Sequence, residues 1–545
     1  MNVPGDVRTV TVAPRGPRPP GGRAGHGGLR LTRRARRALA GGAWVLGALA
    51  AFAAYLRLAG TRAVNSDGAA QALQAWDMLH GNPLLHGWST SDVSFYTTEL
   101  PQYLLVELGL GLGQDVVHVA AAMTYTLVLL LAALVAKGTA TGREAAVRVA
   151  LAAGIMLAPQ LGSGTNVLLS SPDHTGTSVP LLLILLVLDR GRARWYVPVA
   201  VSLLLAWTLI ADPITDVAAV IPLTLVCALR VARGARRREI ALGGAILAAV
   251  GLAVTANHVI DTLGGYTARR FSTQFAPLGE IVGHNLPIAG QCLLLLPGAD
   301  FLGLPAGPET AVALLHLAGA ALAAAGIAAA AGRLRGGDLV SQALLAGIVI
   351  TVAAFVVTPR VYGTASAREI APVLPFAAAL AGRQLARHLV ACCPAGGRHD
   401  PRAARLARRA ARLALGLILA GYLAGLGLAL TAPAAPPQAA GLTAWLERHP
   451  LGTGLSGYWE SSVVTLTSGG RVVPVAWQMK ASWYDPARAS ADFVVLFPGT
   501  DGYPGFEQRQ AVLATFGPPA DTYRVGRSTV LYWHRNLLAS LPAPG

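Results

Sequence analysis

Apolar residues of this chain are gathered into long runs that are separated by short polar and basic segments. Several runs approach or exceed the roughly 20 residues that a helix needs to cross a bilayer. The pattern therefore predicts an all-α polytopic protein with about eleven transmembrane helices. Their expected ranges are 39–59, 116–136, 145–162, 177–189, 195–211, 214–230, 239–260, 309–331, 339–357, 369–391 and 411–431.

Composition and charge support this prediction and add an orientation. The 545 residues are 53% hydrophobic and only 13% charged, whereas about a quarter of the residues of a soluble domain are charged. Of the 44 Lys and Arg residues, 30 lie in the N-terminal tail and in alternate loops. This positive-inside pattern predicts a multi-pass protein of the plasma membrane with a cytosolic N-terminus. The net charge of +17 is thus explained by topology, with the lipid bilayer rather than nucleic acid as the partner.

The composition changes at both ends of the apolar part, and three regions are expected. Residues 1–34 are rich in Pro, Gly and Arg, which is typical of a disordered cytosolic tail. Residues 35–431 form the transmembrane domain, with long outer loops at 60–115 and 261–308. Residues 432–545 are expected to form a small extracytoplasmic α/β domain. Its predicted helices are "GLTAWLERH" and "EQRQAVLATFG", and its predicted strands lie in "VVTLTSGGRVVPVAW", "ADFVVLFPG" and "STVLYWHRNLL".

The first outer loop begins with an acid. In "NSDGAAQALQAWDMLHGNP" the apolar spacing predicts an amphipathic helix over 66–80 that starts close to Asp67. A second helix is expected in "TELPQYLLVELGLGL", because a proline in the first turn starts a helix rather than breaking it. "SDGA" is also a good helix N-terminus, so Asp67 either caps this helix or has a chemical role.

Several stretches together carry a family resemblance. They are the acid after the first transmembrane helix, "HGNPLL", "FYTTELPQYLL", "GQDVVHVAAAM" and, before the tenth helix, "ASAREIAPVLPFAAALAGR". This arrangement resembles the GT-C superfamily of polytopic glycosyltransferases, which includes protein O-mannosyltransferases and the lipid A aminoarabinose transferase. The resemblance implies a GT-C-like fold and transfer of a sugar from a polyprenyl-phosphate donor to a glycan, lipid or protein acceptor. Several GT-C families carry two adjacent acids where this chain has Asp67 and Gly68.

The resemblance also implies roles for polar residues near the outer helix ends. Transfer needs a base for the acceptor hydroxyl, for which Asp67 is the candidate. Arg368, next to Glu369, has a planar fork suited to phosphate, although it could instead snorkel to the interface. Asp173 and His174 in "SSPDHTG" either belong to the site or start a helix. No metal motif is present, and the one cofactor left open is a divalent cation.

Four further residues are candidates for substrate contacts. Arg269 and Arg270 are basic on the side where positive charge is unusual, which fits contact with the carrier phosphate or with anionic headgroups. Trp88 and Tyr96 have faces suited to sugar C–H groups, but aromatic residues are equally expected as interface anchors.

Other polar positions have simpler interpretations. Asp212 and Asp216 in "ADPITD" are expected to be solvated at a tight turn between helices. Tyr458, Trp459 and Glu460 could bind carbohydrate, but aromatic residues are the ordinary core of a small domain.

Two other functional classes remain open. A transporter or flippase for a lipid-linked glycan would show two related halves, which the sequence lacks. A non-catalytic envelope-assembly protein is the other alternative, because glycine replaces the second acid. The sequence has no Walker loop, nucleophile elbow or zincin motif, which leaves ATP-driven transport and serine or zinc hydrolysis without support.

Overall fold

The computed structural model describes most of the chain. The described residues are 33–90, 93–157, 163–191, 194–235, 237–268, 274–391, 401–449, 451, 453–476, 490–497 and 509–540. The chain divides into two compact units, residues 1–47 and 48–545. The described residues of the first unit belong only to the start of α1, so the architecture below is that of the second unit.

Each of the predicted apolar ranges is helical over most of its described residues. Six helical segments are long and apolar enough to cross a membrane: Gly41–Ala59, Gln114–Lys137, Arg237–Thr262, Pro308–Ala331, Leu339–Val357 and Leu413–Leu430. The structure therefore has a polytopic membrane fold, in which six rather than eleven helices meet this criterion over the described residues. The long helices are α1 (Arg33–Ala59), α4 (Gln114–Lys137), α5 (Gly142–Met156), α7 (Asp173–Gly191), α8 (Tyr196–Ala211), α9 (Ile221–Ala232), α10 (Arg237–Thr262), α13 (Pro308–Ala331), α14 (Leu339–Val357), α15 (Val373–Ala391) and α16 (Pro401–Leu430).

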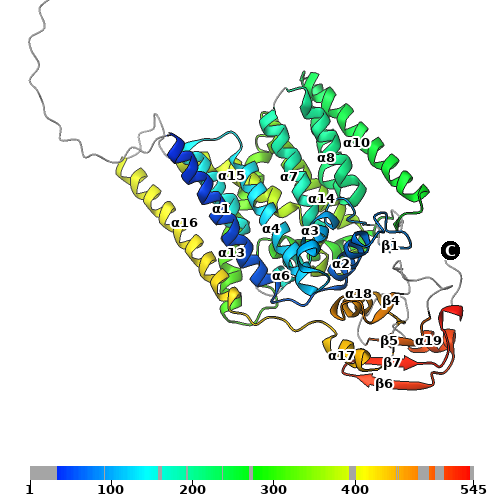
Figure 1. Ribbon diagram of the computed structural model, residues 1–545. Helices are drawn as coiled ribbons and strands as arrows, with labels where there is room; N and C mark the ends of the chain where they lie inside the picture. Colours follow the sequence, from blue (N-terminus) through cyan, green and yellow to red (C-terminus); the bar gives the residue numbers. More distant parts are fainter. Residues whose placement is uncertain are drawn as a thin grey trace, which may run out of the picture. The chain divides into compact units, whose positions relative to one another are not determined.

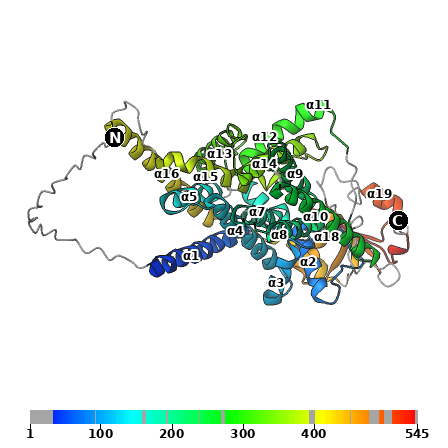
Figure 2. The same ribbon diagram turned by 90° about the horizontal axis from the view of Figure 1, so that it is seen from above.

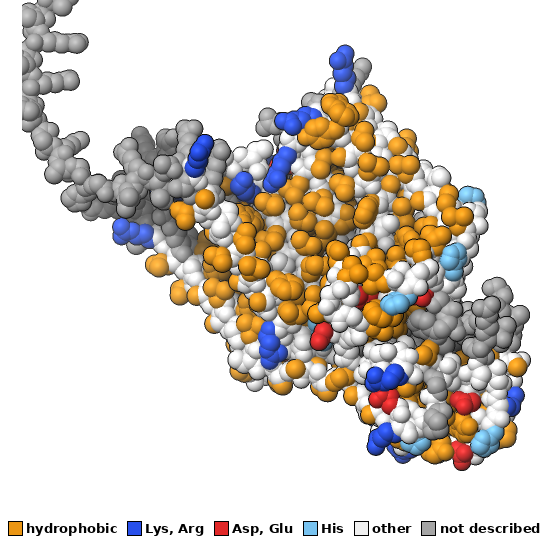
Figure 3. Space-filling view, viewed as in Figure 1, with side chains coloured by type: hydrophobic (Ala, Val, Ile, Leu, Met, Phe, Trp, Pro, Cys, Tyr) orange, Lys and Arg blue, Asp and Glu red, His pale blue; other side chains and the backbone are white. Residues whose placement is uncertain are grey.

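Small residues allow the helices to pack closely around α15, which contacts α4, α5, α13 and α14 (Figures 1 and 2). A Cβ atom added at Gly326 of α13 would lie 2.5 Å from the Cα atom of Ala381 in α15. Close backbone approach through small residues is how helices associate where no water drives them together. The outer flank is apolar instead: Figure 3 shows it covered by hydrophobic side chains, and Leu247 of α10 is 76% exposed. Such exposure fits a lipid environment.

Short elements connect the long helices. The segment 60–115, predicted to be the first outer loop, contains both predicted helices, α2 (Ser66–Leu79) and α3 (Leu100–Leu110). The segment 261–308, expected to be a loop, holds a helical stretch in α11 (Leu278–Glu280), η2 (Ile281–Asn285) and α12 (Leu286–Leu295). Pro287 stands in the first turn of α12, where it favours a helix start. The remaining short elements are β1 (Ser89–Thr90), β2 (Thr267–Ala268), α6 (Ser163–Leu169), η1 (Asp216–Val220) and η3 (Thr364–Ile370).

The last part of the chain forms a mixed five-stranded sheet in the order β4-β3-β5-β7-β6. Strand β3 pairs in parallel with β4 and β5, and β7 pairs antiparallel with β5 and β6. The elements are α17 (Ala440–Arg448), β3 (Thr453–Ser456), α18 (Tyr458–Thr467), β4 (Val473–Ala476), β5 (Phe493–Leu496), α19 (Arg509–Phe516), β6 (Asp521–Val525), β7 (Ser528–Tyr532) and η4 (Leu538–Ser540).

The stretch "VVTLTSGGRVVPVAW", predicted to form strands, contains strand β4 in its second half, but the prediction is wrong for its first half. The residues "VVTLT" belong to α18, because their apolar side chains are used on two sides of a helix. Val463 and Leu466 pack in the cluster that contains α2, whereas Val464 packs in the cluster of the sheet. Tertiary packing here overrides the strand preference of β-branched residues. Helix α18 consequently lies against α2 (Figure 1).

Candidate functional site

Asp67 lies in the first turn of α2 but does not cap it. The cap is Asn65, whose side-chain oxygen accepts a hydrogen bond from the Gly68 backbone N–H at 2.9 Å. Asp67 is therefore not the capping residue of α2, because Asn65 occupies that position. The Asp67 carboxylate instead makes contacts far away in the sequence.

Two side chains from distant segments hold the two oxygens of Asp67. The Arg368 guanidinium, on η3, lies 2.5 Å from Oδ2, and the Tyr458 hydroxyl, at the start of α18, donates to Oδ1 at 2.5 Å. The Asp67 and Arg368 side chains are 19% and 32% exposed, so a ligand can still reach them. Burial, followed by the nearby Asp67 carboxylate, raises the pKa of Tyr458 well above its ordinary value. The tyrosine therefore remains a hydrogen-bond donor.

Asp173 faces the same guanidinium from the start of α7. Its Oδ2 atom is 3.8 Å from Nη1 of Arg368 and accepts from the Ser171 hydroxyl at 2.6 Å. Its Oδ1 atom accepts from Gln71 at 3.0 Å. Gln71 follows Asp67 by one helical turn, so α2 presents both side chains on one face. Asp173 has a φ of +37°, a left-handed conformation that is uncommon for a non-glycine residue. Such backbone strain is frequent at functional positions.

His174 is oriented by a buried acid. Its Nδ1 atom lies 2.8 Å from Oδ2 of Asp212, and the Thr177 hydroxyl donates to the same oxygen at 2.5 Å. Asp212 has no exposed surface, so the prediction that it is solvated at a turn is wrong, whereas Asp216 is exposed. Because a buried carboxylate needs partners, Asp212 is bound by this histidine, by the threonine and by the Ile214 backbone N–H.

A second buried acid lies behind this pair. Glu99 has no exposed surface, and its carboxyl group contacts Gly176 in the first turns of α7, where an added Cβ would clash with it. Its Oε2 atom accepts a hydrogen bond from the Thr98 hydroxyl. Burial raises the pKa of Glu99 well above its ordinary value, and the nearby Asp212 and Asp173 carboxylates raise it further. A neutral carboxyl group is therefore favoured behind the Asp212–His174 pair.

The other predicted site residues lie in different surroundings. Glu369 adjoins Arg368 and is close enough to act electrostatically on His174. Trp88 is 5% exposed and donates to Asp77 at 2.8 Å, and the Tyr96 hydroxyl donates to the Pro83 carbonyl at 2.7 Å. Their polar atoms thus bind the chain itself. Arg269 and Arg270 lie outside the described residues. Among the residues that are described, no group of three or more His, Cys, Asp or Glu side chains could hold a metal ion.

Gly68 stands where several GT-C families carry a second acid, and the packing explains the glycine. A Cβ atom added there would lie 2.6 Å from Cγ1 of Val117 in α4 and 2.9 Å from Cβ of Ser171. Helix α2 therefore approaches its neighbours too closely for any side chain at this position. The glycine lets α2 bring Asp67 and Gln71 up to the start of α7.

Replacing Gly68 with alanine is expected to destabilise the protein by about 1–3 kcal/mol, the usual cost of overpacking. Thermal unfolding in detergent measures it as a lower Tm. The matched control is Gly244→Ala in α10, where an added Cβ meets nothing within 4 Å and no loss is expected. An unchanged Tm for Gly68→Ala would contradict the close packing of α2.

Comparison with known proteins supports the fold but provides no sequence relative. No protein-family model matches the sequence, and no curated protein sequence matches it significantly. The structure is similar to ArnT from Cupriavidus metallidurans bound to undecaprenyl phosphate, with a TM-score of 0.56 and 13% identity over 94% of this chain and 100% of that chain. The apo form of the same protein gives a TM-score of 0.54 and 14% identity over the same shares.

A third solved structure is more distant. The oligosaccharyltransferase AglB from Archaeoglobus fulgidus, in complex with an inhibitory peptide and a dolichol-phosphate, gives a TM-score of 0.43 and 12% identity over 83% of this chain and 69% of that chain. ArnT is an aminoarabinose transferase of the GT-C superfamily. The resemblance noted in the sequence is thus confirmed at the level of the fold, through ArnT.

Proposed function

We propose that this chain, which has the fold of ArnT, transfers a sugar from a polyprenyl-phosphate carrier to an acceptor hydroxyl at the outer face of the membrane. The acceptor is a glycan, a lipid or a protein. The observation that carries the proposal is the contact between Asp67 and Arg368. Their carboxylate and guanidinium groups lie side by side, and both side chains are partly exposed. A base and a phosphate-binding group are the two side chains that this reaction needs side by side.

Asp67 acts as the general base in this proposal. The acceptor oxygen attacks the anomeric carbon, the bond from that carbon to the phosphate oxygen breaks, and the acceptor proton passes to Asp67. The carrier leaves as polyprenyl phosphate, with one more negative charge on its phosphate than in the donor. Arg368 stabilises that added charge through its planar fork.

The ion pair between Asp67 and Arg368 opens in this proposal when the donor binds. An anionic donor phosphate competes with the Asp67 carboxylate for the same guanidinium. Tyr458 keeps the other carboxylate oxygen of Asp67 in place.

Asp173 and His174 complete the proposed site. Asp173, held by Gln71 and Ser171, orients Arg368 between two carboxylates. His174, fixed by Asp212, is proposed to bind the acceptor. The ArnT structure is bound to undecaprenyl phosphate. That complex supports a carrier lipid of the same class for this chain.

The experiment is a transfer assay with the purified full chain in nanodiscs. Polyprenyl-phosphate donors with a radiolabelled sugar are supplied together with lipid, glycan and peptide acceptors. The proposal expects label to leave the donor, an equal amount of polyprenyl phosphate to form, and label to appear on one acceptor class. Movement of intact donor across a liposome bilayer without bond cleavage would indicate a transporter instead. If neither sugar transfer nor donor movement is observed, a non-catalytic role is favoured.

A further inference from the structure

A cavity lies at the other end of the long helices from Asp67. Asp173 and Asp189 are at the two ends of the 19-residue helix α7. At 1.5 Å per residue they are about 24 Å apart. Asp189 lines a cavity of about 810 Å³ between α5, α7, α10, α14 and α15. The loops that meet here are the basic ones, which the positive-inside pattern predicts to be cytosolic.

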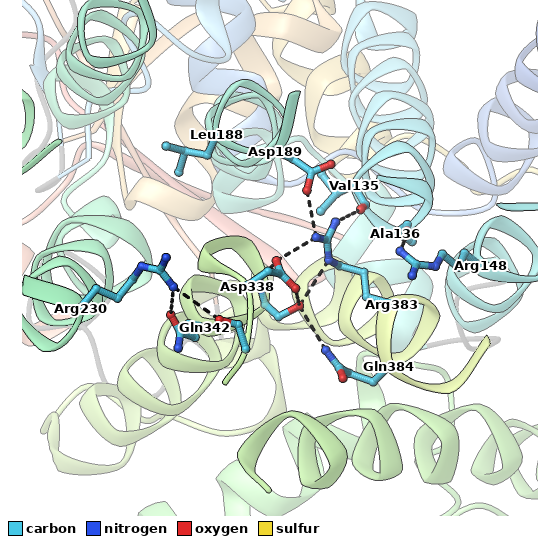
Figure 4. A network of polar contacts seen from close by, with 12 residues as sticks. Val135, Ala136, Arg148, Leu188, Asp189, Arg230, Asp338, Gln342, Arg383 and Gln384 are labelled. Atoms are coloured by element: carbon cyan, nitrogen blue, oxygen red, sulfur yellow. Dashed lines mark hydrogen bonds and ion pairs between the residues drawn. The ribbon is translucent and has the colours of Figure 1, made fainter. Parts of the chain in front are cut away.

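Five guanidinium groups line this cavity, and two carboxylates face them. Both carboxylates are used by one arginine: Nη2 of Arg383 lies 2.9 Å from Asp189 and 2.8 Å from Asp338, as Figure 4 shows. Arg383 also donates to the Val135 carbonyl at 2.8 Å, so it is the structural link between α4, α7 and α14. The lining arginines are Arg148, Arg238, Arg333, Arg383 and Arg387.

Three of these arginines form no ion pair with a carboxylate among the described residues, although Glu239 and Asp189 act electrostatically on Arg238. Arg238 donates to the Leu188 carbonyl at 2.8 Å, while its Nε atom is buried and makes no hydrogen bond there. Arg333 bonds to the side chains of Gln384 and His388 at 3.1 Å, and neither of these carries a carboxylate. Arg387 is exposed, lines the cavity and has no hydrogen-bond or ion-pair partner in the described part of the chain. Arg148, in contrast, is paired with Glu144 at 2.6 Å.

Topology alone does not require this convergence. Basic residues that only set orientation can be spread over the loops. The three arginines without an ion pair, in contrast, come from three separate segments of the chain and line one cavity. A buried guanidinium donor without an acceptor is unfavourable unless a ligand supplies one. Leu339 and Val340, the first residues of α14, also line the cavity, and the start of a helix adds positive potential.

We propose that this cavity binds a phosphate monoester. Its charge of about −1.5 to −2 matches the excess of positive charge, and its oxygens accept the paired N–H groups of guanidinium forks. The group is carried either by a lipid headgroup such as phosphatidate or by a soluble phosphate. This site is separate from Asp67 and does not depend on the transfer reaction.

The test measures phosphate binding to the purified full chain with two probes. Labelled orthophosphate is measured by equilibrium dialysis in detergent, and phosphatidate is compared with phosphatidylcholine by native mass spectrometry. We expect saturable binding of one phosphate group per chain, weakened at least about tenfold by Arg333→Gln together with Arg387→Gln. Binding of both probes would identify a soluble phosphate, and binding of phosphatidate alone would identify a headgroup.

The matched control is Arg335→Gln, which removes the same charge from the same turn but does not line the cavity. It should leave binding unchanged, as should Asp67→Asn. If the double variant does not fold, the test uses Arg387→Gln alone. Arg387 has no partner among the described residues, and its loss is expected to weaken binding about threefold. The inference is overturned if neither probe binds, if the arginine variants bind like wild type, or if Arg335→Gln weakens binding equally.

Discussion

Replacing Asp67 with asparagine is expected to lower the transfer rate by about a hundredfold to ten-thousandfold, the usual contribution of a general base. The amide has nearly the same shape as the carboxylate, and its oxygen can still accept one hydrogen bond, but it cannot take the acceptor proton. The rate of label transfer from saturating donor measures the effect. Because Arg368 is released from its ion pair in this variant, donor binding should be retained or strengthened.

The matched control for this prediction is Asp115→Asn. Asp115 also stands in the first turn of a helix, α4, but it is exposed and is not part of the group around Arg368. Its variant should transfer within about twofold of the wild-type rate, because surface charges contribute little. A rate for Asp67→Asn within threefold of wild type would remove Asp67 as the base. An equal loss in both variants would show that the effect is not local.

The sequence predicted which polar residues lie near Arg368, but it did not predict which of them contact one another. Asp67, Asp173 and Arg368 were each placed at outer helix ends by the alternation of the helices, and a common end is enough to bring polar side chains near one another. The structure then joins them by contacts of 2.5 and 3.8 Å. Periodicity also predicted α2 as a helix. It did not predict the burial of Gln71, because that depends on the bond to Asp173.

Tyr458 shows why other contacts were missed. It lies 391 positions after Asp67, and a local pattern has no information about contacts at that separation. Its neighbours in α18 suggested a strand, because valine and threonine favour strands when packing does not decide. The stretch "GYWE" did signal a polar aromatic segment, but only the contact between α18 and α2 shows that its tyrosine hydroxyl reaches the carboxylate.

Asp212 and Gly68 were misjudged for a related reason. An acid beside a proline at a helix end is usually solvated, and only the fold shows that His174 and Thr177 close over Asp212. The glycine after Asp67 looked like a missing acid. In the structure Gly68 is the position at which α2 packs against its neighbours, and Val117 and Ser171 occupy the space that a side chain would need. Space between elements is a property of packing, which one sequence does not reveal.

Replacing Arg368 with glutamine is expected to lower kcat/KM for the donor by at least about a hundredfold. The guanidinium contributes charge-assisted hydrogen bonds of about 1.5–3 kcal/mol each, and two of them correspond to this factor or more. Its removal also leaves Asp67 and Asp173 facing each other without the positive charge between them. Donor KM should therefore rise together with the fall in kcat, since the phosphate is bound in both the ground state and the transition state.

Arg368→Lys separates charge from geometry. Lysine keeps the positive charge but lacks the planar fork, so its kcat/KM should lie between those of the wild type and Arg368→Gln. The matched control is Arg471→Gln, which removes an arginine 2.6 Å from Glu447 in an exposed ion pair and should leave both constants unchanged. A donor KM that does not change in Arg368→Gln would contradict phosphate binding by this residue. Arg368 would then serve only as the ion-pair partner of Asp67, and the transfer rate of the variant would not be diminished.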